Sequence, residues 1–292
     1  MCAQSQPSHV QFIPAVHLWE GLHKGNFRRE VFGVITTLGY IDESYEGVVA
    51  PETFTLSCSL ACGGDWAFIE AAWVWILAEK NRSLLAEGRK SLSRYHAVDC
   101  FNRTNEFEGW EKEERNAFVQ KLFGVFEMFP TSHITLTISG KDIAEIWPEN
   151  KEQPLHFAYN TLIKFMMLEI GRNHPILGLR GNVSLIYERS DYGESMLKGF
   201  NRMMDDPTFR HRSLFNTLAP MGWESCIPLQ PADLVAYEAF RDMKRRVKNK
   251  PMHPSLKALV EKDNFQLLSK RIERKNLIDL RERHNMAVAR QS

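Results

Sequence analysis

The sequence predicts an α/β fold in which a mixed β-sheet is flanked by helices. In the second half of the chain, short β-rich runs alternate with longer helical patterns, an order that favours parallel strand pairing. Near the beginning, the β-rich runs 34–42 and 53–62 follow each other through Gly47 and Pro51, which is typical of an antiparallel pair. Together the two patterns predict a mixed sheet.

The expected elements each have a signal in the sequence. The segment 133–138 alternates polar and apolar residues, as a half-buried strand does. The helix 111–128 begins with a charged turn that suits the positive end of a helix dipole, and it ends before Pro130. Pro154 is a favourable first residue for a helix that runs to about residue 170. The remaining expected elements are a helix over 65–80, a strand over 183–188, a helix over 191–204, a strand over 214–219 and a helix that begins at Pro228.

Composition is that of an ordinary globular chain. With 292 residues, 43% of them hydrophobic and 25% charged, the chain is long enough for one domain plus an appendage, which is the organisation we favour. No run reaches the ~18 apolar residues of a membrane span, and the first residues lack the pattern of a secretory signal. The five cysteines are an odd number without disulfide spacing, so we expect reduced thiols and a cytoplasmic protein.

Positive charge is concentrated towards the C-terminus. Residues 244–292 contain 14 Lys or Arg against 5 Asp or Glu, a net charge of +9, although the whole chain carries only +1. Cations at this density either attract a phosphate backbone or suit the C-terminal end of a helix dipole. The candidate nucleic-acid-binding residues are Arg241, Lys244, Arg245 and Arg246.

An amphipathic helix is expected within this basic segment. Phe265, Leu268, Ile272 and Ile278 recur at roughly helical spacing, which predicts a helix over 264–283 with an apolar face. That face would dock on the acidic body of the same chain, on a second copy or on another partner. The predicted organisation is an irregular segment 1–30, an α/β domain 31–245 and a basic helical C-terminal extension 246–292.

Acidic residues lie at the ends of three expected elements. Asp42-Glu43-Ser44 follows the first strand, Glu188 closes the strand 183–188, and Asp233 lies near the beginning of the last helix. Hard cations such as Mg²⁺ or Mn²⁺ prefer oxygen ligands, so the three acids could share a metal site. The alternative is that they are ordinary turn and helix-end residues.

The direction of the side chains separates these acids. On a regular strand, Asp42 and Glu43 point to opposite faces, so we expect only one of them to be a ligand. Asp233 shares a helix face with Tyr237 and Phe240. A carboxylate on such an apolar face needs a cation or hydrogen bonds to offset its desolvation, which favours a metal ligand.

The acidic segments resemble those of a known family. In content and order, Tyr40–Ser44, Tyr95–Asp99, Ile186–Glu188 and Leu229–Ala236 resemble the motifs of the family called domain of unknown function 3800, over about residues 34–245. The resemblance implies a ribonuclease H-like fold and a metal-dependent nuclease activity.

The resemblance has two departures. Tyr45 and Glu46 precede Gly47, whereas the family usually has glycine directly after the Asp-Glu-Ser motif. A helical segment also stands between the second and third strands, which leaves the order of the sheet open.

The resemblance suggests a role for each candidate residue. It favours Asp42 over Glu43 as the first-strand ligand, with Glu188 and Asp233 completing a set for Mg²⁺ or Mn²⁺. The hypothesis is phosphodiester hydrolysis by two metal ions. The auxiliary candidates are His96 and Asp99 beside the metal site, Glu43, Ser44 as a turn residue, and Gln230 as a capping or orienting residue.

Other functions stay open at this stage. His96 could instead be a structural histidine in a partly buried loop. The whole chain could be a non-catalytic nucleic-acid-binding or protein-interaction module, or a nucleotide phosphohydrolase that uses the same ligands. Since a site of this kind contacts the sugar-phosphate backbone, the sequence does not distinguish DNA from RNA.

Overall fold

The computed structural model describes residues 36–45, 53–150 and 154–289. The irregular segment expected at 1–30 and the turn that contains Gly47 lie outside these residues. Among the described residues, no helix combines the length and the apolar composition that a membrane span requires.

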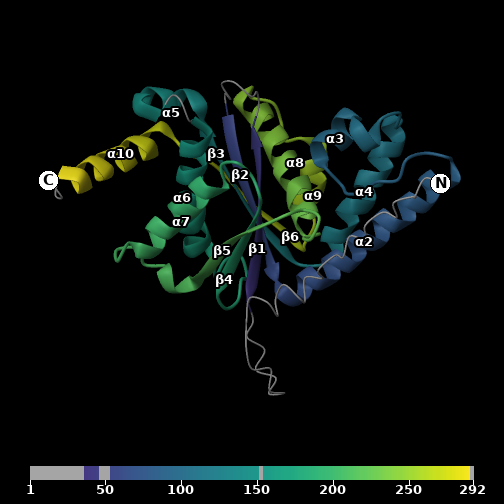
Figure 1. The fold of residues 1–292 in the computed structure, drawn as a ribbon, viewed down its shortest axis with the longest axis horizontal. Helices are drawn as coiled ribbons and strands as arrows, with labels where there is room; N and C mark the ends of the chain where they lie inside the picture. Colours follow the sequence, from purple (N-terminus) through teal and green to yellow (C-terminus); the bar gives the residue numbers. More distant parts are fainter. Residues whose placement is uncertain (1–35, 46–52, 151–153, 290–292) are drawn as a thin grey trace, which may run out of the picture.

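A six-stranded mixed sheet forms the centre of the molecule (Figure 1), in the order β5-β4-β1-β2-β3-β6. The first three strands pair antiparallel, while β4 pairs parallel with β1 and β5, and β6 pairs parallel with β3. The expected mixed sheet with flanking helices is therefore confirmed. The strands are β1 Thr37–Tyr45, β2 Thr53–Cys62, β3 Thr131–Ser139, β4 Val183–Glu188, β5 Phe215–Met221 and β6 Phe265–Arg271.

Helices cover both faces of the sheet (Figure 1). Leu38 and Tyr40 of β1 belong to the hydrophobic cluster that packs α2, α3, α4, α8 and α9 on one face. Ile41 belongs to the second cluster, which packs α5, α6, α7 and α10 on the other face. Alternation along β1 thus supplies both cores. The helices are α2 Gly63–Ala86, α3 Ala97–Asn102, α4 Lys112–Met128, α5 Gly140–Ile146, α6 Pro154–Asn173, α7 Gly193–Asp205, α8 Leu229–Val247, α9 Pro254–Val260 and α10 Arg274–Ala289.

Most expected elements are present, with bounds that differ by a few residues. The helix expected over 65–80 is longer, because α2 runs from Gly63 to Ala86. Three short helices, α3, α5 and α9, were not expected. They have six or seven residues each, which is too short for a helical period to stand out in the sequence.

The prediction of a helix over 264–283 is wrong for residues 265–271. Residues 265–271 form β6, which pairs with β3 along its length. Phe265 is buried at this edge, where its ring stacks on His133 at 4.2 Å and meets Phe126 at 5.7 Å. Backbone pairing with β3 and this burial override the helical spacing of the apolar residues.

The C-terminal segment is consequently part of the α/β unit. A boundary at residue 245 would separate β6 from the sheet that it completes, and the predicted extension 246–292 is not wholly helical. The helix α10 follows β6 and packs against α5 of the same chain, where Arg274 pairs with Asp142 at 3.5 Å and with Glu145. Leu277 of α10 is fully buried in the core of that face.

Removing the Phe265 side chain should destabilise the whole fold. Phe265→Ala should lower the free energy of unfolding by about 3–5 kcal/mol, the usual cost of deleting a buried phenyl ring. Denaturant titration would measure it. Phe68→Ala is the matched control, because Phe68 is 62% exposed. The control should cost about 1.5 kcal/mol at most, the worth of its stacking on Phe129. Equal costs for the two variants would contradict the role of β6.

Candidate functional site: an acidic pocket at one edge of the sheet

The parallel pairing of β1 with β4 brings two acids to the same edge. Ile41 lies opposite Tyr187 in the last pair of this ladder, and the next residues are Asp42 and Glu188. The sequence predicted that the first strand ends at Asp42. In the structure, β1 continues to Tyr45, paired with β2. Asp42 therefore marks the end of the β4 ladder rather than the end of its own strand.

A cavity of about 550 Å³ opens at this edge, and we call it the acidic pocket. The helix α8, which packs on β1 and β2, brings Asp233 to it. The structure thus brings together the three candidate ligands and three of the auxiliary candidates, whereas Asp99 and Gln230 do not line the cavity. The lining residues are Asp42, Glu43, Ser44, Tyr45, His96, Val98, Glu188, Arg189, Ser190, Tyr192, Asp233, Tyr237 and Phe240.

The carboxylates of the pocket interact strongly. Burial raises the pKa of Asp42 well above its usual range, and the negative charges of Asp233, Glu43 and Glu188 raise it further. Burial also raises the pKa of Glu43 to about 7 and that of Asp233 to about 6. Such shifts arise when carboxylates share a site that water screens poorly.

Three of the carboxylates have partners within the protein. Arg94 Nη1 lies 3.4 Å from Glu188 Oε1, the backbone N–H of Ala97 donates to Asp233 Oδ2 at 2.7 Å, and the hydroxyl of Tyr192 donates to Glu43 Oε1. Among the described residues, no group of three or more His, Cys, Asp or Glu side chains is arranged to hold a metal ion. The oxygen ligands suit a hard divalent cation. Their present arrangement, however, does not enclose one.

Both Asp42 and Glu43 line the pocket, although their side chains point to opposite faces of β1, as the sequence predicted. They leave opposite faces of β1, Asp42 on the side of Tyr40 and α8, and Glu43 on the side of α6 and α7. The cavity lies over the end of the β4 ladder, so it is accessible from both faces. Glu43 accepts a hydrogen bond from Tyr192, the residue before α7.

His96 lines the pocket, whereas Asp99 stands behind it. His96 Nδ1 donates to Asp99 Oδ2 at 2.7 Å, and Asp99 Oδ1 accepts hydrogen bonds from Thr104 and Asn105. Asp99 is not among the residues that line the cavity. It therefore orients the imidazole and leaves Nε2 as the ring nitrogen for chemistry in the pocket.

The beginning of α8 holds the loop that carries His96. Gln230 Oε1 accepts from the backbone N–H of Tyr95 at 2.9 Å and from the indole of Trp73 at 3.2 Å. Asp233 accepts from Ala97, on the other side of His96. Gln230 is thus an orienting residue, as the sequence suggested, but it acts on a backbone loop and not on a carboxylate.

Sequence reasoning missed residues in and beside the acidic pocket. Arg94 does not line the cavity, but it pairs with Glu188 and lies 4.3 Å over the ring of Trp223, so it supplies a counter-charge to the acids. Its position two residues before His96 could have indicated it. Arg189 follows Glu188 directly and Tyr192 lies four residues after it, yet nothing in their spacing distinguishes them from ordinary loop residues.

The four candidate nucleic-acid-binding cations lie on α8, and each contacts residues of its own chain. Arg241 bonds the buried Glu238 at 2.9 Å, and Arg246 bonds the buried Asp242 at 2.5 Å. Arg245 donates to the carbonyl of Pro251. Lys244 lies 5.4 Å over the ring of Phe240, a residue of the acidic pocket, so this cation stands at the rim of the pocket.

Comparison of the chain with protein-family models, with curated proteins and with solved structures found no match.

Asp233→Asn should change how stability depends on pH. The raised pKa of Asp233 means that the folded state binds its proton more tightly than the unfolded state, so ionisation destabilises the fold. The variant should therefore gain stability relative to the wild type as pH rises from about 4 to above 6. The gain is on the order of 2 kcal/mol at pH 8, and asparagine keeps an acceptor for Ala97.

Denaturant titrations at pH 5 and pH 8 would measure this difference. Asp263→Asn is the matched control, because Asp263 is exposed in the segment between α9 and β6. Its stability relative to the wild type should not change with pH. A constant difference for Asp233→Asn would show that burial in the pocket does not raise the pKa of its carboxyl.

Proposed function

We propose that the acidic pocket binds divalent cations and that the protein is a metal-dependent nuclease. The observation that carries the proposal is the gathering of Asp42, Glu43, Glu188 and Asp233, from three separate elements, in one cavity where their charges oppose one another. Such a cluster is costly without a counter-charge, and a divalent cation would supply one. The ion would be Mg²⁺ or Mn²⁺, held by Asp42, Glu188 and Asp233.

The resemblance to the domain of unknown function 3800 family supports the same reading. It matches the four segments that contribute to or support the pocket: the end of β1, the His96 loop, the end of β4 and the beginning of α8. A ribonuclease H-like fold is part of the proposal, and a mixed sheet with the first acid on the inner strand β1 is compatible with it.

Each residue has a role that its contacts suggest. When bound, the cations would activate water and stabilise the leaving oxygen. Glu188 would turn from Arg94 towards the cation, and Arg94 with Arg189 would then be free to neutralise a phosphate. His96, with Nδ1 held by Asp99, would exchange a proton at Nε2.

A nucleic acid is the proposed substrate because cations stand on the rim of an acidic cavity. Lys244 and Arg241 follow Phe240 and Tyr237 along α8, and those two rings line the pocket. Cations in that position would hold the phosphates on either side of the bond that is cleaved.

Divalent cations should stabilise the wild-type protein and not Asp42→Asn. At 100 times the dissociation constant, Mn²⁺ should add about 2.7 kcal/mol to the free energy of unfolding of the wild type. Melting curves with EDTA and with Mn²⁺ would measure this. Asp42→Asn removes a buried charge that its neighbours repel, so it should melt no lower than the wild type in EDTA.

Activity is measured on the same proteins. The wild type should cleave an oligonucleotide only with Mg²⁺ or Mn²⁺, Asp42→Asn should be inactive, and Asp263→Asn should match the wild type in both assays. A wild type that gains no stability from Mn²⁺ would refute the metal site. Cation binding without cleavage would refute the nuclease and leave the non-catalytic module, while cleavage of mononucleotides alone would identify a phosphohydrolase.

Removing cations from the rim should flatten the salt dependence of nucleic-acid binding. Lys244→Gln should reduce the slope of log affinity against log salt by up to about 0.9 for a lost contact to duplex DNA. Fluorescence anisotropy in EDTA, where no cleavage occurs, would measure it. Lys141→Gln is the control, because this lysine is 82% exposed on α5, on the opposite face of the sheet. An unchanged slope for Lys244→Gln would remove Lys244 from the proposed interface.

A further inference from the structure

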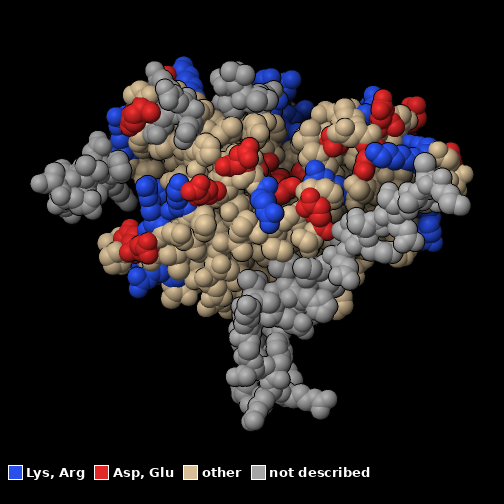
Figure 2. Space-filling model, viewed as in Figure 1, with Lys and Arg blue, Asp and Glu red and all other residues tan. Residues whose placement is uncertain are grey.

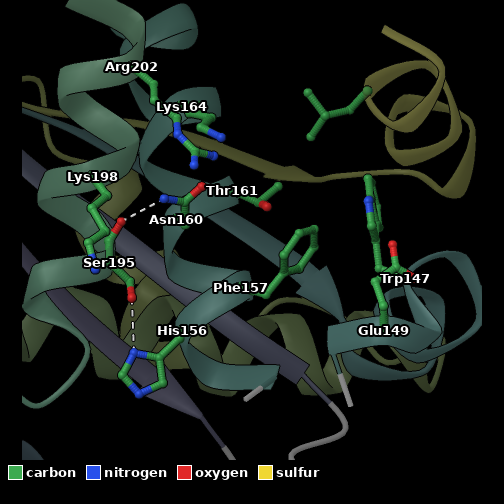
Figure 3. Close-up of a pocket in the computed structure, with 11 residues that line it drawn as sticks. Trp147, Glu149, His156, Phe157, Asn160, Thr161, Lys164, Ser195, Lys198 and Arg202 are labelled. Carbon is green, nitrogen blue, oxygen red and sulfur yellow. Dashed lines mark hydrogen bonds between the residues drawn. The ribbon is translucent and has the colours of Figure 1, made fainter. Parts of the chain in front are cut away.

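A second cavity, of about 520 Å³, lies between α6 and α7, and we call it the basic pocket (Figure 3). Residues at the end of α5, the short helix Pro148–Asn150 and α10 close its other side. It has no lining residue in common with the acidic pocket. The lining residues are Trp147, Glu149, His156, Phe157, Asn160, Thr161, Lys164, Ser195, Lys198, Arg202 and Leu280.

Two cations of the basic pocket have no counter-charge within the described part of the chain. Lys164 of α6 and Arg202 of α7 lie beside each other (Figure 3), and neither forms an ion pair with any described residue. Burial, and then the charge of Arg202, lowers the pKa of Lys164 to about 8. A third cation, Lys198, is already paired with Glu194 at 2.8 Å.

The acid that lines this pocket does not offset the two cations. Glu149 Oε2 lies 3.7 Å from Arg281, a residue of α10. Figure 3 places Glu149 across the cavity from Lys164 and Arg202. Among the residues that the structure describes, no acid lies between these two positive charges on one wall of the basic pocket.

The opposite wall carries aromatic rings beside Glu149. The rings of Phe157 and Trp147 lie 4.8 Å apart, and Leu280 of α10 also lines the cavity. A ligand that fills the cavity would thus meet cations at one end and aromatic rings at the other.

The backbone around the cations is held in place. Ser195 accepts a hydrogen bond from Asn160 at its carbonyl oxygen, and its hydroxyl bonds His156 Nδ1 at 2.9 Å. At Gly199, a Cβ atom would meet the carbonyl oxygen of Asn160 at 2.6 Å, so only glycine allows α7 to lie this close to α6. The wall that carries Lys164 and Arg202 is therefore preorganised, which lowers the cost of binding.

We propose that the basic pocket binds a nucleotide through its terminal phosphate, with the base against the aromatic wall. A phosphate monoester carries a charge of about −1.5 to −2 at neutral pH, which matches the two uncompensated cations better than a carboxylate or a phosphodiester does. A planar base suits the Phe157 and Trp147 side of the cavity. The ligand is either a free mononucleotide or the phosphorylated end of a strand.

This proposal does not depend on the metal site, although the two pockets are neighbours. Tyr192 bonds Glu43 in the acidic pocket, its ring stacks on Tyr159 of α6 at 4.5 Å, and α7 begins at the next residue. Ser195, which lines the basic pocket, lies three residues after Tyr192, so the two pockets are connected through the beginning of α7.

Calorimetric titration in EDTA tests the site without the proposed cations. The probes are a nucleoside, its 5′-monophosphate, inorganic phosphate, and an oligonucleotide with and without a 5′-phosphate. The monophosphate should bind at least about tenfold more tightly than the nucleoside, because charge-assisted hydrogen bonds are the strong ones. It should also bind more tightly than inorganic phosphate. Tighter binding of the mononucleotide would identify a free nucleotide as the ligand. Tighter binding of the phosphorylated oligonucleotide would identify the end of a strand.

Lys164→Met and Arg202→Met should each weaken binding of the monophosphate by about tenfold or more. Lys257→Met, an exposed lysine of α9, should bind as the wild type does. Arg202 is exposed, so its variant keeps the fold even if Lys164→Met melts early. Unchanged affinity in both pocket variants, or equal affinity for nucleoside and monophosphate, would overturn the phosphate site. Inorganic phosphate that binds as tightly as the monophosphate would overturn the assignment to a nucleotide.

Discussion

The parallel alignment of β4 with β1 is the constraint on which the acidic pocket depends. It fixes Asp42 and Glu188 at one edge of the sheet, although they are far apart in the sequence. A shift of one residue in this register would turn the side chains of β4 to the opposite faces and remove Glu188 from the edge. The helix α8 then needs only to pack across β1 and β2 to add Asp233.

The ionised carboxylates of the acidic pocket destabilise the fold. Asp42 is 7% exposed, and the pKa values of Glu43 and Asp233 are raised along with its own, so the ionised cluster opposes folding at neutral pH. The surrounding structure offsets this with the hydrogen bonds of Tyr192, Ala97 and Arg94. Strained or repulsive arrangements of this kind persist where the surroundings over-determine them, and they are common at functional sites.

The local pattern of polar and apolar residues predicted most of the helices and strands. The strand 133–138 and the helix 111–128 were evident from alternation and from end signals, and the mixed sheet followed from the order of elements. The strand 265–271 was not evident from the sequence, because the spacing of its apolar residues fits either a helix or an edge strand. Only pairing with β3 decides between the two. Tertiary contacts also decide the site: Arg94 meets Glu188 across 94 positions of sequence, and Asp99 is separated from the cavity by the imidazole that it holds. The basic pocket was not predicted, since its cations lie on two separate helices, α6 and α7, which only folding brings together.

The late position of β6 along the chain has a consequence for synthesis. Ser132 of β3 and Gln266 of β6 are 134 residues apart, so at 5–20 residues per second a ribosome makes β6 roughly ten seconds after β3. Until β6 emerges, β3 is an open edge whose backbone donors and acceptors can pair with another chain. The nascent protein is therefore most exposed to aggregation in that interval, and holding the unfinished sheet apart from its neighbours is a task for chaperones rather than for the native contacts.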